Sequence, residues 1–270
     1  MSFTSVALAF AGAVPAAGDT FTPPSPADFW QPMFGSGAWA FTRPMAVSLI
    51  ITVIVAAWLL IASARASAVP TKGQFYLEYV YNFVRNDIAR DMIGSKHFRP
   101  FLPLLLALFT FILFNNLAGV IPPFQNPPTA RIGFPIALVL VVYLTYHYVG
   151  LRKHGVGGYF KSMVPSGLPG WIVPFIFLIE AITKFAVQPL TLTLRLFGNM
   201  MAGHMVLVLF ILGGEFLLFH GDGILKAAGI ASFAGGVLMT VFEMLIQFLQ
   251  AYVFTLLTAS YIGSSLSDEH

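Results

Sequence analysis

Residues 171–212 read WIVPFIFLIEAITKFAVQPLTLTLRLFGNMMAGHMVLVLFIL, a long apolar stretch without a cluster of turn-forming residues. Its pattern predicts helix over all 42 residues. Residues 227–263 form a second helix-compatible stretch of 37 residues. At 1.5 Å per residue, the two helices would be roughly 63 and 55 Å long, about twice the ~30 Å hydrocarbon core of a bilayer. Both stretches therefore point to a membrane protein with unusually long helices.

Such lengths allow two interpretations. Either each stretch breaks into two upright spans, or each forms one steeply tilted helix. A break at mid-depth would need a polar turn, and lipid cannot hydrogen-bond to the backbone of such a turn. The candidate breakpoints are Pro189, which has no turn formers beside it, and Gly235–Gly236. We therefore predict two unbroken, steeply tilted helices, which would form a curved wall against another object in the membrane.

The remaining spans are marked by charge-free runs of about the length that crosses a bilayer. The stretch from Thr71 to Arg99 differs, because it mixes aromatic residues with charged ones and is typical of an interfacial amphipathic helix. We predict an all-α integral membrane protein with about five crossings, built as a single membrane domain over residues 1–270. Its parts are an outside N-terminal segment (1–43), a first span (44–64), the interfacial helix (71–99), a helical hairpin (101–151) and the long tilted hairpin (171–263).

Composition supports this class of protein. Apolar residues make up 57% of the chain and charged residues only 9%, whereas a soluble domain carries roughly 25% charged residues. The absence of cysteine excludes disulfides and thiolate metal sites. The net charge of +3, without a basic cluster, argues against nucleic acid as a partner. The first 20 residues lack a basic leader, so we expect an ordinary N-terminus, with a cleaved signal as the alternative.

The distribution of basic residues predicts the orientation. Of the 14 Lys and Arg residues, nine fall in the connections at 65–99 and 152–161, which lie on one side if the chain crosses five times. Only Arg43, Arg131 and Lys226 lie on the other side. Because basic loops stay in the cytoplasm, the N-terminus is expected outside and the C-terminus in the cytoplasm.

Ionisable residues inside the two long helices are the candidates for function: Glu180, Lys184, Arg195, His204 and Glu243. A charge at mid-bilayer costs at least ~2.5–3.5 kcal/mol, so each needs a reason. Lys184 lies near a helix end, where its side chain can reach the interface. Arg195 has no other charged residue within ten positions on either side, which favours a function for it.

The spacing of these residues predicts their partners. If the helices form an antiparallel hairpin about Gly221–Asp222–Gly223, then Arg195 lies opposite Gln250 and His204 lies opposite Glu243. The second pair would lie about 13 Å further toward the outside than the first, nine residues along the helix.

The types of these residues are suited to proton transfer. Imidazole titrates near neutrality and a buried carboxylate can also hold a proton there, so His204 and Glu243 can relay protons. Arginine stays protonated, so Arg195 suits a fixed positive charge rather than a relay. Glu180 could line a separate inner approach. The alternative for His204 is a buried histidine that a carboxylate merely stabilises.

The run PLTLTLRLFGNMMAGH at residues 189–204 closely resembles the fifth-helix motif of the a subunit of F-type ATP synthases. The resemblance spans roughly residues 75–270, through EMLIQFLQAYVFTLLTASYIG (243–263), NLAGVIPP (116–123) and the terminal SDEH. It implies that Arg195 is the stator arginine facing the carboxylates of a rotating c-ring. It further implies that polar residues line two aqueous half-channels: Asn199, His204, Glu243 and Gln250, with Glu180 on the cytoplasmic side.

This resemblance implies a proton-translocating subunit that couples proton flow to ring rotation and ATP synthesis. The implied partners are c-ring proteolipids, b-type peripheral-stalk subunits, membrane lipid and, indirectly, the soluble ATPase sector. No cofactor is expected, and the chain has no GxxxxGK[ST] motif for nucleotide. A bacterial plasma membrane is expected, with the mitochondrial inner membrane as the alternative.

Two other functions fit the sequence less well. A self-contained proton-coupled transporter usually has internal repeats, and none is visible between the halves of this chain. A structural scaffold of the membrane does not explain an isolated arginine at mid-depth.

Overall fold

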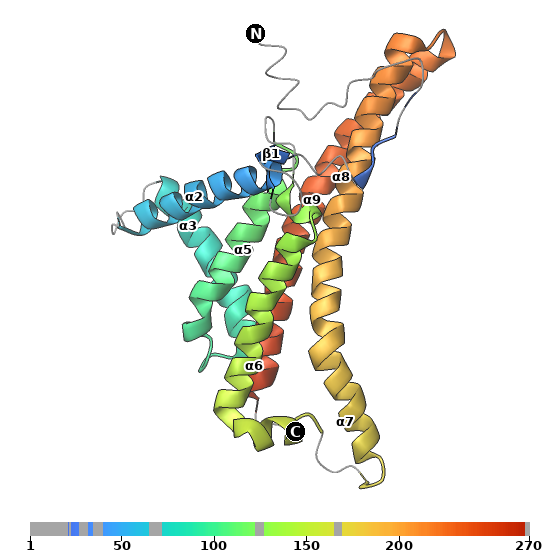
Figure 1. Ribbon diagram of the computed structural model, residues 1–270. Coiled ribbons are helices and arrows are strands. Elements are labelled where there is room, and N and C mark those ends of the chain that lie inside the picture. The colour runs from blue at the N-terminus through green and yellow to red at the C-terminus, as the bar shows by residue number, and fades with distance from the viewer. Residues whose placement is uncertain are drawn as a thin grey trace. The chain divides into compact units, whose positions relative to one another are not determined.

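The computed structural model describes residues 21, 23–26, 32–34, 40–64, 72–121, 127–164 and 169–267 (Figure 1). The expectations for the first 20 residues and for the last three of the SDEH motif lie outside this part. A small antiparallel pair of strands, β1 (Pro32–Phe34) and β2 (Phe41–Thr42), precedes the helices. Long helices dominate the described chain.

Five helical runs are long and apolar enough to cross a membrane, as predicted. They are α2 (Arg43–Ala64), α5 (Leu102–Leu117) with the preceding 3₁₀ turn Arg99–Phe101, α6 (Gly133–Lys161), the run Val173–His220, and α9 (Ile224–Leu266). The prediction of an all-α integral membrane protein is confirmed. Between α2 and α5 lie α3 (Lys72–Asn82), the π-helical segment η3 (Phe83–Arg90) and α4 (Asp91–Ile93), and a 3₁₀ turn (Pro128–Ala130) precedes α6.

The third span is longer than predicted. The expected polar connection after Leu151 is helical up to Lys161, and α6 bends at Gly155. This residue has φ 68° and ψ 172°, a left-handed conformation that glycine adopts without a steric penalty. Gly155, which lies in the expected connection, therefore bends the helix. Figure 1 shows the end of α6 turning aside.

The long stretch 171–212 is not broken, in agreement with the prediction. It forms α7 (Val173–Ile182), the π-helical turn η6 (Thr183–Val187) and α8 (Gln188–His220). Pro189 has no N–H to donate, so it cannot continue regular α-helical hydrogen bonding to the preceding turn. The backbone compensates with one wider turn and keeps its polar groups inside the helix.

Contacts divide the chain into two compact units. The first comprises Met1–Ala57, Phe111–Arg131 and Phe197–Gln250, and the second comprises the remaining segments. In the first unit, Val47 and Ile51 of α2 pack against Ala118. The single membrane domain of the sequence analysis stays a prediction.

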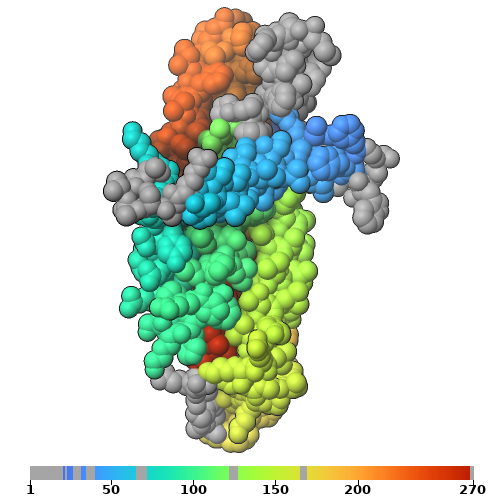
Figure 2. Space-filling view, turned by 90° about the vertical axis from the view of Figure 1, so that its left-hand side faces the viewer, coloured from blue at the N-terminus to red at the C-terminus, as the bar shows by residue number. Residues whose placement is uncertain are grey.

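The core of the second unit forms around the last part of α9. Ala251, Phe254, Ala259 and Ile262 of this helix are completely buried. Phe83 of η3 joins the aromatic rings of α5 and α9, with centroid distances of 5.6 Å to Phe109 and 5.8 Å to Tyr252. Figure 2 shows the C-terminal part of α9, in red, between the lower ends of α5 and α6.

Candidate functional site

The hairpin of α8 and α9 turns where the sequence predicts. α8 ends at His220, α9 begins at Ile224, and Gly223 between them has φ 56°. The two helices approach closely, since a Cβ on Gly229 would lie 3.0 Å from the carbonyl oxygen of Gly214. The Ser232 hydroxyl also donates a hydrogen bond to the carbonyl of Phe210 at 2.8 Å. Figure 1 shows the helices running antiparallel from this turn.

This packing brings His204 and Glu243 together, as predicted. Nδ1 of His204 lies 3.9 Å from Oε1 of Glu243, within ion-pairing range but longer than a hydrogen bond. The side chains are only 7% and 2% exposed. Gly203 lies beside the carboxylate, because a Cβ there would be in ordinary van der Waals contact, 3.7 Å from Cγ of Glu243. Gln247, one helical turn after Glu243, is also buried.

Gln250 has a polar partner on α8. The side-chain amide of Asn199 donates a hydrogen bond to Oε1 of Gln250 at 2.9 Å. Asn199 comes four residues after Arg195 in the same helix. Two pairs of polar side chains, Asn199 with Gln250 and His204 with Glu243, therefore connect α8 with α9 in the first unit.

Arg195 lies in the second unit and is half-buried. Glu180 forms an ion pair with Lys184 at 3.6 Å, four residues further along the chain. Lys184 was expected only to reach the interface, although a carboxylate and an ammonium four residues apart on a helix often interact.

An aromatic cluster that the sequence analysis missed holds the π-helical turn. The hydroxyl of Tyr146 in α6 donates a hydrogen bond to the carbonyl of Lys184 at 2.9 Å. This carbonyl lacks its regular backbone donors, because the amide of Gln188 bonds to Thr183 and Pro189 has no N–H. The sequence signal was Pro189 itself, whose missing N–H leaves a carbonyl that a neighbouring side chain must satisfy.

His147 completes this cluster. Its ring stacks on Phe185 of the π-helical turn at a centroid distance of 4.8 Å. Its Nδ1 lies 2.6 Å from the hydroxyl of Tyr159, which the bend of α6 brings back toward it. The run YLTYHYVG at residues 143–150 carries Tyr146 and His147 on one helix, and only their contacts identify what they hold.

Comparison with known proteins agrees with this reading of the helices. The family model described as ATP synthase A chain matches residues 45–263. The chain is 40% identical to an ATP synthase subunit a of Nocardioides sp. over 94% of its length and 96% of that protein. It is 39% identical to an ATP synthase subunit a of Rhodococcus erythropolis over 94% of both chains. The chain therefore belongs to the ATP synthase A chain family, the proton-translocating a subunits of F-type ATP synthases.

Proposed function

We propose that this chain supplies two offset half-channels for protons and the fixed charge that separates them. The observation on which the proposal rests is the buried pair of His204 and Glu243 within the α8–α9 hairpin. Two titratable groups in contact, away from bulk water and on opposite helices, can accept and release a proton without a large conformational change.

Protons enter from the outside past His204 and Glu243. Asn199 and Gln250 continue the polar path along the hairpin, where their hydrogen bond provides both a donor and an acceptor. From there the proton neutralises a carboxylate of the rotating ring. Each proton that crosses the membrane releases about 2.3 kcal/mol per 100 mV, which the ring converts into rotation.

Arg195 is the stator charge in this mechanism. As a permanent cation it holds an approaching ring carboxylate in its ionised form, and it repels protons that would pass straight between the half-channels. Glu180, which pairs with Lys184 at 3.6 Å, lines the exit toward the cytoplasm. After nearly a full turn of the ring, the proton leaves by this side.

As a member of its family, the chain is part of the membrane sector of an ATP synthase and a multi-pass bacterial membrane protein. Its proposed direct partners are the c-ring proteolipids and the b-type peripheral stalk, and the soluble ATPase sector connects indirectly. Exposed apolar side chains along α9, among them Val237, Val241 and Leu245, support contact with the ring or with lipid. The N-terminus lies outside and the C-terminus in the cytoplasm.

Replacing Arg195 with alanine tests the proposal. In inverted vesicles, Arg195→Ala abolishes ATP-driven proton pumping and increases the passive proton leak, because no fixed charge separates the half-channels. Arg195→Lys should restore little of the pumping, since a buried ammonium can lose its proton. ATP hydrolysis by the soluble sector is measured alongside and can persist.

Arg152→Ala is the matched control, because it removes an exposed arginine of α6 away from the proposed path. It should pump normally. A structural role for Arg195 predicts a different result, namely less assembled complex with unchanged pumping per complex. Normal coupling in a fully assembled Arg195→Ala enzyme would overturn the proposed mechanism.

A further inference from the structure

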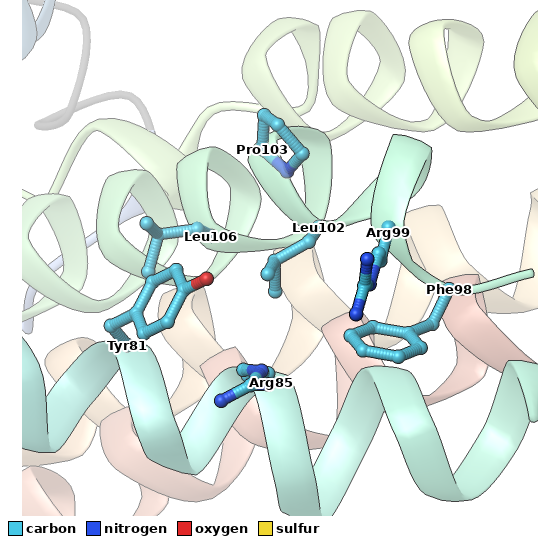
Figure 3. A pocket seen from close by; sticks show the side chains of 7 residues that line it. All are labelled: Tyr81, Arg85, Phe98, Arg99, Leu102, Pro103 and Leu106. Carbon is cyan, nitrogen blue, oxygen red and sulfur yellow. The ribbon is translucent and has the colours of Figure 1, made fainter. Parts of the chain in front are cut away.

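A cavity of ≈ 470 Å³ opens in the second unit. Figure 3 shows the helix that contributes Tyr81 and Arg85 on one side of it and the helix of Leu102 and Leu106 on the other. The full lining consists of Tyr81, Arg85, Phe98, Arg99, Leu102, Pro103 and Leu106. The proposed proton path uses none of these residues.

A reversal of the chain builds this cavity. Gly94 ends α4 with φ 87°, and the amide of His97 donates back to the carbonyl of Gly94 at 3.3 Å. A 3₁₀ turn with Pro100 in its first positions then starts α5. The outgoing helix therefore returns along the incoming one and places Arg99 near Arg85.

The charged residues that line the cavity are all basic. None of the seven lining residues is acidic, and two of them are arginines. Within the described part of the chain, neither Arg85 nor Arg99 has a recorded hydrogen bond or ion pair to its guanidinium. Each guanidinium offers five N–H donors in a planar fork that matches the oxygens of a phosphate. Two cations that have no partner among the described residues are suited to bind an anionic ligand.

The other side of the cavity is apolar. Phe98 and Leu102, which are 5% and 7% exposed, line it together with Pro103 and Leu106 of α5. Arg99 is the first residue of the membrane-spanning run Arg99–Leu117. The guanidiniums therefore lie at the edge of the apolar layer, and the leucines begin its interior.

We propose that this cavity binds the headgroup of an anionic phospholipid. Arg85 and Arg99 hold the phosphate, and the Tyr81 hydroxyl donates a further hydrogen bond. The first methylene groups of an acyl chain cover Leu102 and Leu106. A free phosphate ion would satisfy the charges but leave this apolar wall exposed, so the mixed lining favours the amphipathic ligand.

The test uses the assembled enzyme in nanodiscs that contain phosphatidylglycerol with a photoreactive group in its acyl chain. After illumination, mass spectrometry locates the label, which we expect on residues 98–106. Removing both charges with Arg85→Gln and Arg99→Gln should weaken labelling about thirtyfold, from the usual contribution of two basic residues to lipid binding.

Arg90→Gln with Lys96→Gln is the matched control. It removes two exposed basic residues from the same connection without touching the cavity, and labelling should remain at the parent level. Leu106→Trp fills the apolar part of the cavity without changing its charge, so it should also reduce labelling. This variant tests the proposal if the double arginine variant fails to assemble.

Three results would overturn the proposal. Equal labelling in the parent and both cavity variants would show that the lipid does not use this site. Loss of labelling in excess inorganic phosphate would assign the cavity to a free anion. Absence of label on residues 98–106 in the assembled enzyme would mean that another subunit covers the cavity.

Discussion

Nδ1 of His204 lies 3.9 Å from Oε1 of Glu243, across the hairpin that α8 and α9 form. The two residues are 39 positions apart in the sequence, and the close approach of the helices at Gly214 and Gly229 brings them together. Both side chains are buried, so a proton or an ion pair shared between them is shielded from bulk water.

Removing either member of this pair should slow proton translocation. A positioned acid–base group typically contributes about 10²–10⁴-fold to a proton-transfer step, so we expect His204→Ala and Glu243→Ala to reduce flux by at least about 10²-fold. Proton uptake into vesicles driven by a set potential measures this flux, with subunit abundance determined by immunoblot.

The exchanged variant, His204→Glu with Glu243→His, should recover much of the flux, because the same two groups remain across the hairpin. His220→Ala removes an exposed histidine at the end of α8 and should pump like the parent. Single variants of the pair that are as active as the parent would reduce it to a packing contact.

Cysteine labelling tests the orientation. The chain has no cysteine, so Lys161→Cys and Asp222→Cys each introduce one reactive thiol at an exposed position. A membrane-impermeant maleimide should label residue 161 in inverted vesicles and residue 222 in right-side-out vesicles, because the basic connections stay in the cytoplasm. Labelling of both positions from the same side would contradict the five-crossing orientation.

The close helix approach predicts a steric effect at Gly229. A Cβ at this position would lie 2.9 Å from Cγ of Leu218 and 3.0 Å from the carbonyl oxygen of Gly214. Gly229→Ala should therefore force the helices apart and destabilise the protein by about 1–3 kcal/mol, measured as a lower melting temperature in detergent. Gly236→Ala on the same helix meets only ordinary contacts at 3.6 Å or more and should melt like the parent. Equal melting of both variants would speak against tight packing at Gly229.

The hydrogen bond from Tyr146 predicts an effect on the π-helical turn. Tyr146→Phe leaves the carbonyl of Lys184 without its side-chain donor, at a cost of about 1–3 kcal/mol if the carbonyl stays buried. We expect faster amide hydrogen exchange at residues 183–188 and a lower melting temperature. Tyr143→Phe removes a hydroxyl that makes no hydrogen bond within the described residues, so it should leave amide hydrogen exchange unchanged. Parent-like exchange in Tyr146→Phe would mean that the π-helical turn does not depend on this bond.

The sequence alone determined the class of fold and the position of the hairpin. Charge-free runs of about 20 residues and two much longer, mainly apolar stretches predict five crossings, because hydrocarbon disfavours charges and excludes unpaired backbone groups. The glycines around Asp222 mark the turn, and counting outward from it pairs His204 with Glu243 without further information. Helical geometry is regular, so spacing along the chain translates directly into spacing in the membrane.

Only the tertiary structure decided which side chains meet between elements that are not joined by a short turn. The cavity of Arg85 and Arg99 depends on how far the chain reverses after Gly94, and the bond from Tyr146 to Lys184 depends on how α6 packs against the π-helical turn. Gly155 looked like part of a loop and instead bends a helix. These contacts depend on which polar groups remain without a hydrogen bond once the helices pack. The local sequence does not tell which neighbour supplies the missing hydrogen bond.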